Sequence, residues 1–177
     1  MLFTLAIIFI AMSILSPQAK PTQDAAMDKP ICMMAIDIDW DGTLRSDVDL
    51  WVKDPGDEKS IGFSNAHGMY ADLVRDDLGS LVDLNGRHSE RTCIRGIVDG
   101  SYTIGVDLFR HESGEVLPIQ VHVLVSIVDL SSATLVHLYD GTVTLDATRQ
   151  EETAINFVMS RGQLVAGSLD HIPNPIK

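Results

Sequence analysis

Alternation of apolar and polar residues is the feature that most constrains the fold of this chain. Apolar side chains recur at every second position in two early segments: Met34, Ile36, Ile38, Trp40, Val48, Leu50 and Val52. A period of two places them on one face of a β-strand. No segment after residue 16 keeps a 3.6-residue apolar repeat for three turns. The pattern therefore predicts an all-β body.

Short turn sequences such as Asp140-Gly141 separate the strand candidates. These candidates are residues 34–40, 47–53, 61–64, 69–75, 92–98, 102–110, 117–128, 134–138, 142–145, 153–159 and 164–169. Many short strands at intervals of about 8–12 residues are typical of an antiparallel sandwich or barrel. We predict a jelly-roll-like antiparallel β-sandwich over residues 32–170, with a tail at 171–177. Matching strand phases predict one shared core: Trp40, Val48, Leu50, Tyr102, Ile104 and Val106.

The first sixteen residues form an uncharged apolar run. As a helix they would span about 24 Å, at about 1.5 Å per residue, against a hydrocarbon core of about 30 Å. The run has no Lys or Arg before it, unlike a typical signal peptide. The possible cleavage sites are also poor, because Pro17 directly follows Ser16 and would occupy position −3 for cleavage after Ala19. We expect an uncleaved membrane-anchor helix at residues 1–16, with a cleaved signal peptide and a buried helix as alternatives. Residues 17–31 would be a Pro-rich linker.

Acidic residues outnumber basic ones in this chain. It carries 25 Asp and Glu against 13 Lys and Arg, a formal net charge of −12. Such a surface repels phosphate backbones, so nucleic acid is not expected as a partner. The apolar content is too high for a disordered chain. The residues after the linker suit one domain of about 145 residues.

Two cysteines, Cys32 and Cys93, leave a single possible pairing. A disulfide would be expected if the domain lies outside the cytoplasm. Both cysteines fall in strand-like segments, where unpaired thiols behave as small apolar side chains. We favour two buried thiols over a disulfide. Their wide separation is unlike a zinc site, which needs closely spaced pairs.

Two acidic motifs raise the question of calcium. The sequence DIDWDG at 37–42 opens like a calcium loop, but Val48 replaces the Glu of the twelfth position and the segment alternates as a strand, which argues against an EF-hand. Asp47 and Asp49 would face the same side of a strand, about 7 Å apart at Cα. Calcium would relieve their repulsion, and we predict these ligands: Asp47, Asp49, Asn65, Asp76 and Asp77. The alternative is a solvated strand face.

A resemblance to known domains rests on four motifs. They are DVDLWV at 47–52, Asp-Pro-Gly at 54–56, RDDLG at 75–79, and Arg-Gly-Ile at 95–97 followed by Gly-Ser-Tyr. Over residues 36–110 the pattern resembles bacterial pre-peptidase C-terminal domains and, more loosely, TerD-type tellurium-resistance domains. The resemblance implies a β-sandwich of the kind found in bacterial and phage proteins, including membrane-tethered ones. The resemblance also implies calcium binding through Asp47 and Asp49, because several relatives bind calcium through the aspartates of this motif.

Enzyme motifs are absent: the sequence has no G-x-S-x-G, H-E-x-x-H, P-loop or G-x-G-x-x-G. We expect a non-enzyme, a membrane-anchored binding or structural module outside the cytoplasm, on the periplasmic side. Its partners would be the membrane and other membrane or assembly proteins, and its layout resembles accessory subunits of ion-driven membrane motors. One alternative is a phage or bacterial structural component. The other is a secreted carbohydrate-binding module with Trp51 and Phe109 as outward aromatic residues.

Overall fold

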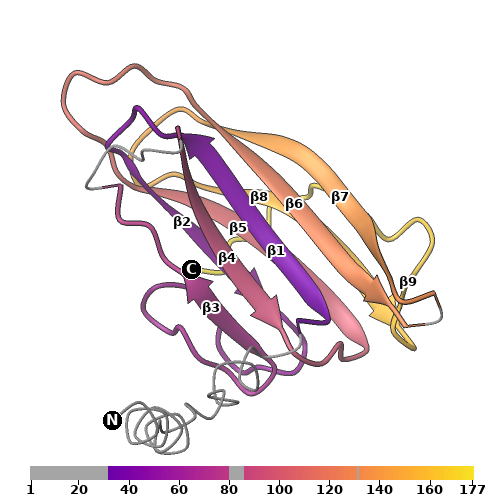
Figure 1. The fold of residues 1–177 in the computed structure, drawn as a ribbon. Coiled ribbons are helices and arrows are strands. Elements are labelled where there is room, and N and C mark those ends of the chain that lie inside the picture. Colours follow the sequence, from indigo (N-terminus) through magenta and orange to yellow (C-terminus); the bar gives the residue numbers. More distant parts are fainter. Residues whose placement is uncertain (1–31, 80–85, 131) are drawn as a thin grey trace, which may run out of the picture. The chain divides into compact units, whose positions relative to one another are not determined.

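The computed structural model describes residues 32–79, 86–130 and 132–177, which form two antiparallel sheets (Figure 1). The strands are β1 (Met34–Asp41), β2 (Asp47–Lys53), β3 (Ala71–Arg75), β4 (Arg87–Ile94), β5 (Gly100–Arg110), β6 (Ile119–Asp129), β7 (Thr134–Leu145), β8 (Glu151–Ser160) and β9 (Gln163–Leu164). One sheet has the order β3-β4-β1-β6-β7 and the other β2-β5-β8-β9. The predicted all-β antiparallel sandwich is confirmed.

The anchor and linker predicted at residues 1–16 and 17–31 lie outside the described residues. Within the described part of the chain, no helix is long and apolar enough to cross a membrane.

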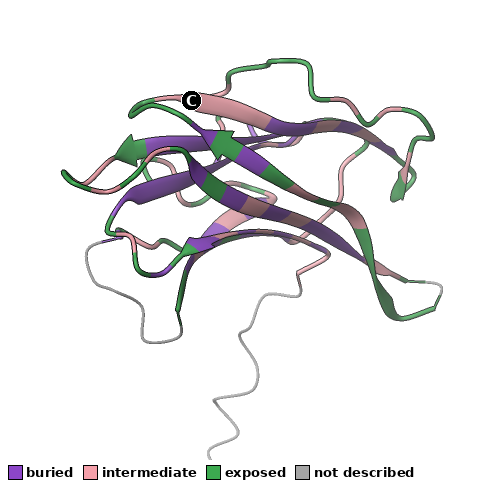
Figure 2. Ribbon diagram, turned by 90° about the horizontal axis from the view of Figure 1, so that it is seen from above, coloured by how far each residue is buried: buried purple, intermediate pink, exposed green. Residues whose placement is uncertain are grey.

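The core lies between the two sheets, as the alternation requires. In β1, Met34, Ile36, Ile38 and Trp40 are fully buried, while the residues between them are only half-buried. Figure 2 shows buried residues along the strands of both sheets. All six residues predicted to share a core belong to one hydrophobic cluster, so that prediction is confirmed.

Several strand predictions differ from the structure: β4 covers Arg87–Ile94 where 92–98 was predicted, and β9 covers Gln163–Leu164 where 164–169 was predicted. Asp140-Gly141, predicted as a turn, lies inside β7, where these two residues pair with Leu124 and Val123 of β6. Residues 61–64 form no named strand, and Ile61 makes only an isolated bridge to Val52. At Asp140-Gly141 the turn sequence is overridden by pairing with β6, whereas residues 61–64 lack, among the described residues, a neighbouring strand with which to pair along their length.

The prediction of two free thiols is wrong, since Cys32 and Cys93 form a disulfide with their Cα atoms 5.3 Å apart. The reason is strand pairing: β1 and β4 are neighbours, with Ala35 opposite Cys93, so the residues just before β1 lie beside β4. The bond ties Cys32, two residues before β1, to β4 of the five-stranded sheet. Closing a loop of 61 residues contributes about 2–4 kcal/mol, mainly by restricting the unfolded chain.

Candidate metal centre

Strand β2 places Asp47 and Asp49 on the face of its sheet opposite the core. Val48 and Leu50 belong to the core cluster, so the alternating aspartates point outward. Both are nevertheless buried, with 6% and 3% of their surface exposed. The alternative of a solvated strand face is therefore wrong. Two buried aspartates on one strand need a compensating charge, a proton or a ligand.

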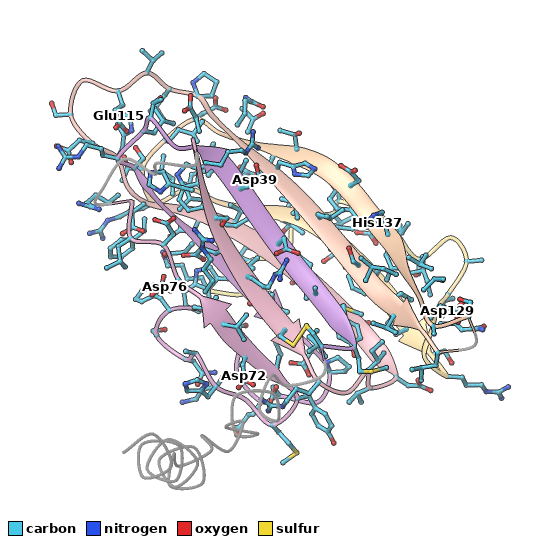
Figure 3. All side chains as sticks on the ribbon, in the orientation of Figure 1. Asp39, Asp72, Asp76, Glu115, Asp129 and His137 are labelled. Carbon is cyan, nitrogen blue, oxygen red and sulfur yellow. A yellow bond between two sulfur atoms is a disulfide. The ribbon has the colours of Figure 1, made fainter. Side chains whose placement is uncertain are left out.

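Three carboxylates meet where β2 approaches β4. Asp49, Asp76 and Glu90 each offer an oxygen, and these oxygens lie within 4.8 Å of one another. Asp76 is exposed and follows β3 (Figure 3), whereas Glu90 is buried and comes from β4. Because β2 is an edge strand of its sheet, the backbone N–H of Leu50 can donate to Glu90 Oε2, at 2.7 Å. Glu90 thus links the two sheets at this edge of the sandwich.

Asp107 adds a further buried carboxylate, since it pairs with Asp49 across β2 and β5. Two cations near this group are Lys177, paired with Asp107, and Arg110, whose Nη2 lies 3.8 Å from Asp47 Oδ2. One oxygen each of Asp47, Asp49 and Asp107 is buried without a hydrogen-bond partner among the described residues. Such buried unpaired atoms are uncommon in folded proteins and call for an explanation. We call these five residues the acidic cluster: Asp47, Asp49, Asp76, Glu90 and Asp107.

Burial and mutual repulsion make this cluster hold protons tightly. Desolvation, followed by the negative charges of Asp47 and Asp107, raises the pKa of Asp49 to about 7. Desolvation raises the pKa of Glu90 to about 10, with the hydrogen bond to Asp76 adding to it and the one from Leu50 opposing it. Near neutral pH the cluster therefore retains protons that a cation would displace. Carboxylate oxygens are the ligands preferred by calcium, which takes six to eight of them or of waters and carbonyls.

Two of the predicted ligands have other partners. The side-chain amide of Asn65 donates to the carbonyl of Ser60 at 3.0 Å. Both oxygens of Asp77 lie 3.0 Å from His88 Nδ1. Burial alone would raise the pKa of Asp77, but the hydrogen bonds from Gly79 and His88 lower it. The structure brings neither residue into the group of three converging oxygens, and Asp77 acts instead as an acceptor that orders its loop.

The acidic residues of the 37–42 segment lie on the outer face of the other sheet. Arg91 Nε donates to Asp37 Oδ1 at 2.5 Å. Asp39 forms an ion pair with Arg87, and its Oδ2 lies 2.9 Å from His122 Nδ1. These aspartates join β1 to β4 by ion pairs and to β6 by the contact of Asp39 with His122. They take no part in the acidic cluster.

The two aromatic residues predicted to face outward differ in their exposure. Trp51 is on the outer face but only 5% exposed, because Gly62 covers its ring so closely that a Cβ there would lie 2.5 Å from Trp51 Cε3. Phe63 packs edge-on against Trp51, with ring centroids 5.5 Å apart. Phe109 is 41% exposed. Of the predicted pair, only Phe109 offers an aromatic surface to a ligand.

One Ser-His-Glu group occurs at the turn before β2, and its geometry is structural. The buried hydroxyl of Ser46 donates to Glu115 Oε2 at 2.5 Å, and His111 Nδ1 lies 3.1 Å from the same hydroxyl (Figure 3 labels Glu115). A hydroxyl that is buried and donates its proton to a carboxylate is not placed to attack a substrate. The network fastens the loop before β6 to the turn before β2.

No family model matches this chain, and neither does any curated protein or solved structure.

Proposed function

We propose that this chain is a membrane-tethered β-sandwich module outside the cytoplasm whose sheet edge is stabilised by a calcium ion. The observation that carries the proposal is the acidic cluster with its buried, unpaired oxygens. Asp49, Asp76 and Glu90 would hold the ion, and Asp47 would add negative charge beside it. The ion would bridge β2, β4 and the segment after β3, so its role would be to rigidify an edge used in binding or assembly.

Two further observations support the location. The Cys32–Cys93 disulfide suits an oxidising compartment, because such bonds are rare in the cytosol. The apolar run at residues 1–16 suits an anchor in the membrane that bounds that compartment. A pull transmitted through the linker would reach the sandwich at Cys32, which is covalently bonded to β4. A structural component of a phage or bacterial particle is the second candidate, since the same disulfide would strengthen an assembled sandwich.

Calcium is expected to raise the melting temperature of the folded chain. At calcium one hundredfold above Kd, the gain is about 2.7 kcal/mol, or about 5–10 °C for a domain of this size. Asp49→Asn should melt no lower than the native chain in chelator, because it removes a buried charge, yet should gain nothing from calcium. Asp37→Asn, which changes an aspartate of the other sheet, should keep the full response. A native midpoint indifferent to millimolar calcium would contradict the proposal.

The tether predicts how the native chain fractionates. We expect it to sediment with membranes, to be released by detergent and not by high salt, and to keep residues 1–16 when its intact mass is measured. Co-sedimentation with detergent-resistant particles would favour the second candidate. A soluble protein whose intact mass corresponds to a chain starting near Lys20 would exclude the anchor.

A further inference from the structure

Residues 170–177, here called the strap, cross the outer face of the four-stranded sheet. The first part is held to β8, where Asn156 Nδ2 donates to Asp170 Oδ1 at 2.7 Å. Further along, the strap makes three more hydrogen bonds, two with β8 and one with the loop after β2: Asn174 N to Thr153 Oγ1 at 2.8 Å, Ile176 N to Glu151 Oε1 at 2.7 Å, and Ser60 Oγ to the carbonyl of Ile176 at 2.7 Å. The segment predicted as a tail at 171–177 is thus packed along the sandwich.

The strap delivers a cation to the acidic cluster. Lys177 Nζ forms an ion pair with Asp107 Oδ2 and lies 5.6 Å from the centre of the Phe109 ring. Asp107 is fully buried, and its other oxygen has no hydrogen-bond partner within the described residues. Asp107 also sits directly opposite Asp49 in the β2–β5 register. Lys177 therefore compensates one of two facing carboxylates, and the second belongs to the proposed calcium ligands.

We infer that Lys177 sets the affinity of the acidic cluster for a divalent cation, because its ammonium group is a built-in competitor for the same negative charge. The inference rests on the proposed calcium site and adds a residue that acts on it from the strap. A cation at Asp49 repels Lys177, and a docked Lys177 repels the cation. Binding free energies are reciprocal, so calcium must loosen the strap by the same factor by which the strap weakens calcium.

The test is a calorimetric titration of the folded chain with calcium chloride. Lys177→Met should bind calcium about tenfold more tightly than the native chain, a coupling within the usual range for interacting sites. Lys177→Arg keeps the charge, and Lys59→Met removes an exposed lysine that lines the same cavity as Lys177. Both variants should stay within about threefold of the native affinity, since each keeps a positive charge at residue 177, beside Asp107.

A double variant guards against misfolding, because Lys177→Met alone leaves Asp107 without its partner. Asp107→Asn combined with Lys177→Met removes both charges of the ion pair, so its calcium affinity should return to within about threefold of the native value. A double variant that kept the tenfold gain would overturn the charge argument. So would equal affinities of the native chain and Lys177→Met.

Hydrogen exchange supplies a readout that does not depend on affinity. Saturating calcium should speed exchange of the backbone amides of Asn174 and Ile176, which donate to Thr153 and Glu151. Unchanged exchange in calcium-bound protein would overturn the inference while leaving the proposed site intact. Absence of calcium binding in every variant would overturn the proposed function, and this inference with it.

Discussion

Replacing Trp40 with alanine is expected to lower the free energy of unfolding by about 3–5 kcal/mol. Trp40 is fully buried near the end of β1, in the middle strand of the five-stranded sheet. Its ring stacks on that of His88 in β4, with centroids 5.4 Å apart. Alanine would leave a cavity that flanking strands cannot close, because β1 is held on both sides by β4 and β6. Urea denaturation at fixed pH and calcium measures the loss.

The matched control is Leu135→Ala in β7, an edge strand of the same sheet. Leu135 is 60% exposed, so its truncation should change stability by no more than about 0.5 kcal/mol. Equal losses at the two positions would show that Trp40 does not pack as the core requires.

Strand phase was predictable where one face of a strand meets the core. In β1 and β5 the inward residues repeat at every second position, so the pattern alone identifies Trp40, Tyr102 and Ile104 as core. The pattern does not reveal whether the face opposite the core is also covered. Strand β2 is buried on both faces, and nothing in the alternation of Asp47 and Asp49 reveals that the face carrying them is buried.

The candidate site was only partly predictable because it joins the two sheets. Asp49 and Asp76 were predicted as ligands from short acidic motifs in neighbouring segments. Glu90 was missed, since the strand containing it was predicted to begin at residue 92 while β4 begins at Arg87. One pattern could have found it: in this segment His88, Glu90 and Thr92 share the inward phase, which puts a carboxylate toward the core. The Asp107–Lys177 pair spans 70 residues and follows from topology, which no local motif records.

In the presence of chelator, raising the pH from 5 to 8 is expected to destabilise the folded chain by several kcal/mol. The pKa of Asp49 rises from 3.8 to about 7 on folding, and that of Glu90 from 4.5 to about 10. The folded state thus holds protons that the unfolded state has already released. This stabilisation is complete below about pH 4 and is lost as pH climbs towards the folded values. Each such group lowers the free energy of unfolding by about 1.4 kcal/mol for every pH unit between its unfolded and folded pKa values.

A carboxylate whose pKa is lowered in the folded chain does not change the stability between pH 5 and 8. Asp77 has a lowered pKa through hydrogen bonds from Gly79 and His88 that outweigh its burial. Its contribution is lost only as pH falls below the ordinary range of aspartate, near 4. Between pH 5 and 8 the lowered pKa of Asp77 therefore adds nothing to the slope that the acidic cluster produces. Chemical denaturation at half-unit steps of pH, with chelator throughout, would measure the slope.

Glu90→Gln isolates the source of this slope, because the amide imitates a protonated acid and its oxygen still accepts from Leu50 N. This variant should lose less stability between pH 5 and 8 than the native chain does. Calcium should also flatten the native profile, since the ion replaces the protons, so the gap between calcium and chelator should widen as pH rises. A native chain in chelator that becomes more stable from pH 5 to 8 would show that these carboxylates ionise without penalty. The acidic cluster would then have no need of a cation.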